Sequence, residues 1–149
     1  MWNKEKSITL SLFSVRLFAV VLVGVCITAP WLFERFSLVR HMVPQQMLRF
    51  FLVTVYSVAV PAAIALWQLH GLLFEIRKEQ VFTAANVARL RVLSWCCLAA
   101  GAICLASVLY YPPFLALAAA GAFMALILRV VKNVFEQAVA LKAENDFTI

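Results

Sequence analysis

Few side chains in the apolar parts of this sequence could carry a proton or hold a ligand. They are Arg16, His70, Glu75 and Arg129, and each falls in or beside one end of an apolar segment. Ionisable side chains within a membrane span are functional candidates by default. A structural role is the alternative, because a long arginine side chain near the end of a span can extend to the interface. We keep both interpretations: an inner-side polar cluster in which His70 senses protons or binds a ligand beside Glu75, or separate structural residues.

The cysteines form no metal-binding or redox motif. Cys26, Cys96, Cys97 and Cys104 lie in or beside apolar runs, without C-x-x-C or Cys/His spacing. We expect them to pack as small apolar residues, and the adjacent pair leaves redox chemistry or acylation open. The motifs of zinc proteases, serine hydrolases, P-loop proteins and dinucleotide-binding enzymes are absent from the sequence. We therefore predict a protein that is not an enzyme, with no catalytic residues, metal site or cofactor.

The composition indicates that these residues are positioned within a membrane. Of 149 residues, 65% are hydrophobic and 13% charged, whereas a soluble domain has roughly 45–50% apolar and about 25% charged residues. A soluble chain this short could not bury so much apolar surface, so the solvent must be lipid. In a membrane protein, the net charge of +6 raises the question of which side of the membrane carries the cations. We expect no direct binding to nucleic acid.

Four segments are long and apolar enough to cross a bilayer, given ~20 residues per helical span. We predict an all-α integral membrane protein in which residues 1–149 form a single domain. The first span is predicted to be retained rather than cleaved as a signal peptide, because Arg16 interrupts it and Pro30 follows its one small-residue site. The third and fourth spans are separated by "YYPP" and should form a tight hairpin. The predicted spans are about 12–33, 48–74, 92–111 and 113–131.

The distribution of Lys and Arg predicts the orientation, because cytoplasmic loops carry an excess of these residues. Four spans place both termini and the middle loop on one side, which holds ten of the 13 cations, and Arg35, Arg40 and Arg49 lie on the other side. The side with ten cations should be cytoplasmic. The sequence therefore predicts a multi-pass protein of the bacterial cytoplasmic membrane with its amino and carboxyl termini inside.

The third and fourth helices are predicted to extend past the membrane into the cytoplasm. Thr83 is a suitable N-cap, so the third helix should run from Ala84 to Tyr111, or about 42 Å at 1.5 Å per residue. Helical spacing of apolar residues continues the fourth helix to about Ala143, and the inner extensions are predicted at 83–91 and 132–144. Val87 and Leu90 should face Val134, Phe135 and Leu141, with Arg89 and Arg91 toward phosphates or solvent.

Two stretches at this inner side resemble a known bacterial family. The pattern F-[ST]-x-x-N-x-x-x-L-R fits Phe82, Thr83, Asn86, Leu90 and Arg91, and a tail pattern fits Leu141, Glu144, Asn145, Asp146, Thr148 and Ile149. These stretches are similar to the small four-span membrane proteins classed as domain of unknown function 2975. No enzymatic role is attached to that family. Its members often neighbour small helix-turn-helix regulators, so the resemblance implies a role in membrane-linked transcriptional control.

We therefore expect a non-enzymatic membrane anchor or regulator that docks a cytoplasmic partner, such as a small helix-turn-helix transcription factor. The alternative is a membrane protein that handles a small molecule, lipid or ion as an oligomer. In either case the lipid bilayer is a partner, and a homo-oligomer is left open by the sequence. The candidate docking residues are Phe82, Thr83, Asn86, Arg89, Leu90, Arg91, Glu144, Asn145 and Asp146.

Overall fold

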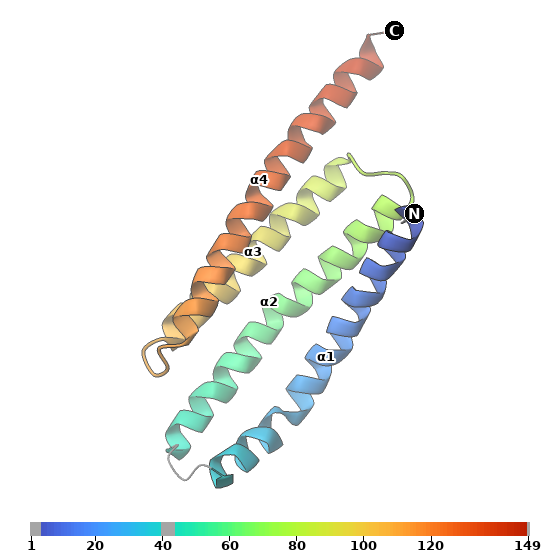
Figure 1. The fold of residues 1–149 in the computed structure, drawn as a ribbon. Coiled ribbons are helices and arrows are strands. Elements are labelled where there is room, and N and C mark those ends of the chain that lie inside the picture. Colours follow the sequence, from blue (N-terminus) through green and yellow to red (C-terminus); the bar gives the residue numbers. More distant parts are fainter. Residues whose placement is uncertain (1–3, 40–43, 149) are drawn as a thin grey trace.

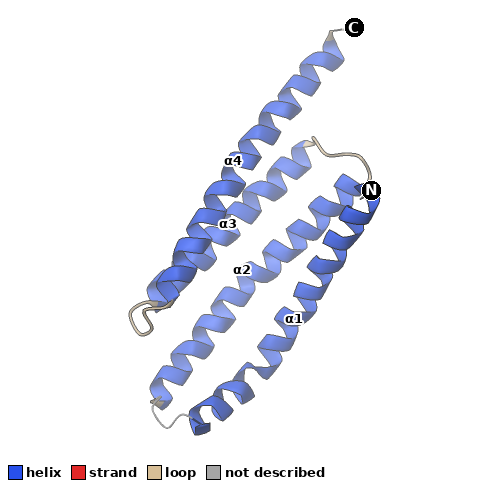
Figure 2. Cartoon of the chain, in the orientation of Figure 1, coloured by secondary structure: helices blue, strands red, loops and turns tan. Residues whose placement is uncertain are grey.

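The computed structural model describes residues 4–39 and 44–148, and within these ranges the regular structure is entirely helical. Four α-helices follow one another along the chain (Figures 1 and 2). They are α1 (Lys4–Val39), α2 (Gln45–Arg77), α3 (Ala84–Ser107) and α4 (Phe114–Phe147). Arg40, one of the three cations assigned to the outer side, lies outside the described residues.

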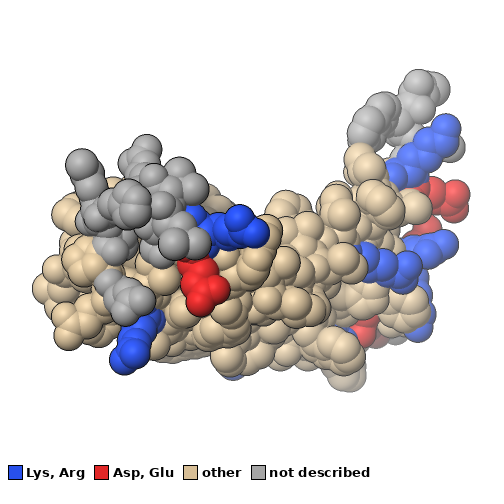
Figure 3. Space-filling model, turned by 90° about the horizontal axis from the view of Figure 1, so that it is seen from below, with Lys and Arg blue, Asp and Glu red and all other residues tan. Residues whose placement is uncertain are grey.

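Each of the four helices is long and apolar enough to cross a membrane. The shortest, α3, has 24 residues and spans about 36 Å, which exceeds the ~30 Å hydrocarbon core of a bilayer. Large apolar side chains such as Val60, Trp67 and Phe123 are exposed between the helix ends, as expected of surfaces that contact lipid. Most of the face seen in Figure 3 is uncharged, with charged side chains gathered toward its two sides. These findings confirm the predicted all-α fold with four membrane-crossing helices.

The helices form a row in sequence order rather than a closed bundle. Helix α2 packs against α1 and α3, and α4 packs against α3, whereas no contact joins α1 to α3 or α4 within the described ranges. Figure 1 shows the antiparallel course of neighbouring helices. The start of α1, the end of α4 and the α2–α3 loop consequently lie at one end of the row, which we call the basic end, and the α3–α4 turn lies at the other.

Small residues bring α3 and α4 close together. A methyl group at Gly121 would lie 2.9 Å from the Cα atom of Gly101 and 3.1 Å from the carbonyl oxygen of Cys97. Ser94 adds a buried hydrogen bond across the same pair, in which its hydroxyl donates to the carbonyl of Ala125 at 2.9 Å. Close backbone approach over small residues is a common basis of helix association in membranes, so these contacts fix α4 against α3.

An aromatic cluster joins the helices at the end opposite to the basic end. The ring of Phe51 on α2 lies 5.8 Å from that of Phe33 on α1, 5.2 Å from that of Tyr111 and 5.8 Å from that of Phe114 on α4, measured between centroids. Beside this cluster the hydroxyls of Thr54 and Ser107 share a buried hydrogen bond of 2.8 Å between α2 and α3. Phe51 thus links three helices and the α3–α4 turn.

Two helix ends differ from the predicted ones. Helix α3 ends at Ser107 rather than Tyr111, and the amides of both Tyr110 and Tyr111 donate to the carbonyl of Ser107 in the turn that follows. Pro112 disfavours the α conformation at Tyr111, the predicted last residue, because a residue before proline is restricted to extended conformations. Helix α4 continues to Phe147, four residues beyond the predicted Ala143.

Candidate docking surface at the basic end

The α2–α3 loop begins with a Schellman motif that stops α2. The amide of Gln80 donates to the carbonyl of Glu75 at 3.1 Å, and the amide of Glu79 donates to the carbonyl of Ile76 at 3.1 Å. The motif places Glu79 in the left-handed region, with a φ of 62°. Glycine usually occupies this position, because a β-carbon is unfavourable there. The chain turns sharply here and starts α3 only a few residues later.

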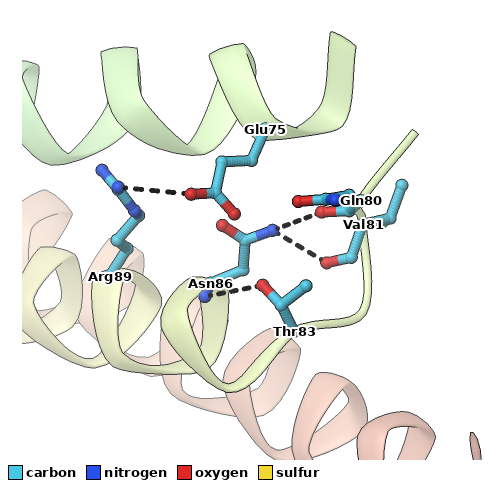
Figure 4. A network of polar contacts seen from close by, with 6 residues as sticks. All are labelled: Glu75, Gln80, Val81, Thr83, Asn86 and Arg89. Atoms are coloured by element: carbon cyan, nitrogen blue, oxygen red, sulfur yellow. Dashed lines mark hydrogen bonds and ion pairs between the residues drawn. The ribbon is translucent and has the colours of Figure 1, made fainter. Parts of the chain in front are cut away.

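Asn86 holds this loop against the first turn of α3. Its side chain is completely buried, and Nδ2 donates to the carbonyls of Gln80 and Val81 at 2.9 Å each (Figure 4). Its backbone amide donates to the hydroxyl of Thr83 at 3.3 Å, so the predicted N-cap is confirmed. The Oδ1 atom of Asn86 is buried without a hydrogen-bond partner among the described residues. The side chain therefore determines the loop conformation.

Arg89 connects α3 to α2 beside this loop. Its Nη2 atom lies 3.6 Å from Oε1 of Glu75, and both side chains are about three-quarters buried. Figure 4 shows the Glu75 carboxylate between the Arg89 guanidinium and the Asn86 amide. A methyl group at Gly71 would lie 1.6 Å from Nη1 of Arg89, so the guanidinium occupies space that only glycine leaves free. The expectation that Arg89 faces phosphates or solvent is corrected by this ion pair.

Leu90 lies in the apolar core beneath the loop. It packs with Leu72 of α2 and Leu93 of α3, and the partly buried Val131 and Phe135 of α4 cover this group. Leu90 and Asn86, both expected on the docking surface, are therefore buried and face the protein interior. Phe135 packs against the group that contains Leu90, in agreement with the predicted packing between α3 and α4. Val134 and Leu141, expected in the same contact, are instead exposed, because they lie on the other side of α4.

The exposed rim of this region consists of aromatic and charged side chains from the α2–α3 loop, α3 and α4. The ring of Phe82 packs against that of Phe135, with 5.3 Å between centroids. Glu136 forms two ion pairs. Nζ of Lys132 lies 2.9 Å from its Oε2 atom, and Nη2 of Arg91 lies 3.8 Å from its Oε1 atom. The hydrogen bond from Lys132 and its charge lower the pKa of the Glu136 carboxyl from its ordinary value, and the charge of Arg91 acts in the same direction. The predicted pair of Lys132 and Glu136 is thus confirmed.

The last turns of α4 project beyond the start of α3 (Figure 1). We call residues 139–147 the α4 extension. Leu141 is 66% exposed and Phe147 is 91% exposed, so both apolar side chains point into the surroundings. The candidate residues Glu144, Asn145 and Asp146 are exposed on the same segment. Ile149, which also fits the tail pattern, lies outside the described residues.

The four residues expected in a polar cluster occupy three separate places. Arg16 and His70 line one cleft of about 310 Å³ between α1 and α2. Glu75 pairs with Arg89. The guanidinium of Arg129 lies 5.6 Å from the ring centroid of Trp95, between α3 and α4. The row of helices keeps α4 away from α1, so the structure does not bring the four together.

The cysteines and other metal-ligating residues form no site in the described part of the chain. All four cysteines are free thiols, and Cys96 and Cys104 are buried. No group of three or more His, Cys, Asp or Glu side chains comes together there. The arrangement at the basic end offers ion pairs, apolar side chains and a projecting helix, which are features of a binding surface.

Comparison with protein families gives one match that covers most of the chain. The family described as "Protein of unknown function (DUF2975)" matches residues 18–149. Comparison with curated proteins and with solved structures found no match.

Proposed function

The chain belongs to the DUF2975 family of proteins of unknown function, and on this premise we propose that it docks a cytoplasmic partner at its basic end. We infer a non-enzymatic protein of the bacterial cytoplasmic membrane, acting as an anchor or regulator. A small helix-turn-helix transcription factor is the partner implied by the sequence resemblance.

The observation that carries this proposal is the exposure of apolar side chains on the α4 extension. Phe147 lies 16 residues beyond Val131, the end of the predicted fourth span, and is 91% exposed. Sixteen residues of helix cover about 24 Å, whereas the headgroup region adds only ~5–8 Å on each side of the ~30 Å core. Leu141 and Phe147 would therefore stand in water, where exposed apolar side chains commonly mark an interaction site.

The orientation in the proposal rests on the distribution of cations. The basic end carries ten of the 13 Lys and Arg residues, and the positive-inside rule assigns such an end to the cytoplasm. A partner that controls transcription would be found in the same compartment.

The chemistry of the α4 extension favours a protein over the membrane surface. Glu144 and Asp146 add negative charge beside the apolar side chains, whereas Lys142 supplies the one cation. Anionic lipids attract basic segments and repel acidic ones. A partner with basic residues around an apolar groove would match both features, and DNA-binding proteins carry strongly basic surfaces.

Co-purification of full-length variants tests the proposal. L141S/F147S removes the two exposed apolar side chains, and K142S is the control at a neighbouring exposed position. We expect the parent and K142S to capture a cytoplasmic DNA-binding protein. L141S/F147S should capture about tenfold less, since loss of an anchoring side chain costs ~1–2 kcal/mol or more. Equal capture by both variants, or the absence of a DNA-binding protein, would refute the proposal.

A further inference from the structure

A cationic cleft lies between α3 and α4 on the face that also carries Trp95. It has a volume of about 380 Å³. The guanidinium of Arg129 packs over the indole of Trp95, and tryptophan is enriched at the level of lipid headgroups. Glu136 is the carboxylate that pairs with two of the three cations here. The residues around the cleft are Arg91, Ser94, Trp95, Arg129, Lys132 and Asn133.

An apolar groove continues from this cleft along the α3–α4 seam. A second cleft of about 160 Å³ shares Ser94 and Arg129 with the cationic cleft. A third, of about 320 Å³, shares Leu98 and Ala122 with the second. The third is lined mainly by alanine, glycine and leucine of both helices. Because these side chains are small, the three clefts join into one surface groove, which leads from the cations into the apolar part of the span.

The length of the groove fits one leaflet of a bilayer. Ser94 lines its cationic end and Leu105 its apolar end. Eleven residues of α-helix separate them, which corresponds to about 16 Å. Half of the ~30 Å hydrocarbon core is ~15 Å, so an acyl chain whose headgroup lies at Arg129 would reach the membrane midplane near Leu105.

We propose that this groove binds one anionic phospholipid from the leaflet at the basic end. The phosphate lies among Arg91, Arg129 and Lys132, and one acyl chain follows the seam past Leu98 and Ala122. Basic pockets between membrane helices are the sites at which anionic headgroups bind. The site goes beyond the proposed docking function, because its ligand is a lipid and its groove leads away from the α4 extension along the α3–α4 seam.

The charges argue against other occupants of the groove. Two copies of this chain with the same orientation in one membrane would bring equivalent cations of both copies together, which is electrostatically unfavourable. A free phosphate ion would use the cationic cleft and leave the apolar groove empty. An anionic lipid fits both the cationic cleft, through its phosphate, and the apolar groove, through its acyl chain.

Native mass spectrometry of the full-length protein in detergent tests the proposal with phosphatidylglycerol and phosphatidylcholine of equal chain length. We expect about tenfold tighter binding of phosphatidylglycerol, since each basic residue near an anionic headgroup contributes on the order of 1 kcal/mol. R129Q/K132Q should abolish this preference. R77Q/K78Q removes the same charge from exposed residues at the same end and should retain it.

A second variant tests the acyl-chain path separately. A122F places a large ring at the join of two clefts and leaves all cations in place, so binding of phosphatidylglycerol should weaken severalfold. Equal binding of both lipids by the parent protein would overturn the proposal, as would equal loss of preference in R77Q/K78Q. Unchanged binding by A122F, full competition by inorganic phosphate, or a dimer that excludes lipid would overturn it as well.

Discussion

The guanidinium of Arg89 lies in the space left by the missing side chain of Gly71. A methyl group at position 71 would stand 1.6 Å from Nη1 of Arg89, so the two residues cannot coexist in this geometry once position 71 carries a β-carbon. The glycine on α2 thereby gives the arginine of α3 access to Glu75, 3.6 Å away. This contact ties the start of α3 to the end of α2 beneath the proposed docking surface.

G71A should displace Arg89 from Glu75 with little change in the free energy of unfolding. Alanine gains about 0.5–1 kcal/mol over glycine within a helix, while a partly exposed ion pair contributes about 0–1 kcal/mol. A double-mutant cycle of R89Q and E75Q, measured by denaturant unfolding in micelles, should give a coupling energy of about 0.5–1 kcal/mol in the parent background. The coupling should fall to near zero in G71A. Equal coupling in both backgrounds would contradict the contact.

N86A should lower the free energy of unfolding by about 1–3 kcal/mol, because the carbonyls of Gln80 and Val81 lose their donor. The exposed Asn133 on α4 provides the control. N133A should change stability by no more than about 0.5 kcal/mol. Thermal unfolding followed by circular dichroism compares the two variants. If N86A were as stable as N133A, Asn86 would not hold the loop.

E79G should stabilise the protein by about 1 kcal/mol, because glycine adopts the left-handed conformation at the end of α2 without steric cost. E79A removes the same side chain but keeps the β-carbon. E79A should therefore show no gain in stability. If both variants gained equally, the effect would come from the lost charge of Glu79 and not from backbone strain. Unfolding midpoints in the same micelles distinguish the two cases.

F51A should lower the free energy of unfolding by about 2–4 kcal/mol, because it removes a ring that contacts aromatic residues of other helices and of the α3–α4 turn. Phe123 is the matched control, since it is 63% exposed on the outer surface of α4. F123A should have a much smaller effect on the unfolding midpoint. Similar losses in both variants would show that Phe51 is no more than a lipid-facing ring.

Hydrophobic runs and capping residues were sufficient to predict most of the fold. The four helices follow from the lengths of the apolar segments, and the start of α3 follows from Thr83 as its N-cap. Lys132 and Glu136 pair as their spacing predicts. These features are local in sequence, so single-chain patterns reveal them.

The site was less predictable because its contacts join residues on different helices. The pairing of Arg89 with Glu75 depends on how α2 and α3 face each other, and an isolated glycine at position 71 was its only sequence signal. Asn86 fits the family pattern, but the pattern does not distinguish a buried loop clamp from a docking residue. Val134 and Leu141 recur near Phe135 at helical spacing in the sequence, yet they lie on the other side of α4 and are exposed.

Position-specific photocrosslinking in intact cells tests the docking proposal most directly. A photoreactive amino acid replaces Leu141 or Phe147 on the α4 extension, and replacement of Leu109, 94% exposed at the opposite end, serves as the control. The proposal predicts an adduct with a cytoplasmic DNA-binding protein from positions 141 and 147 and none from position 109. Adducts only with lipid or a second copy of this chain, or no protein adduct at either position, would contradict it.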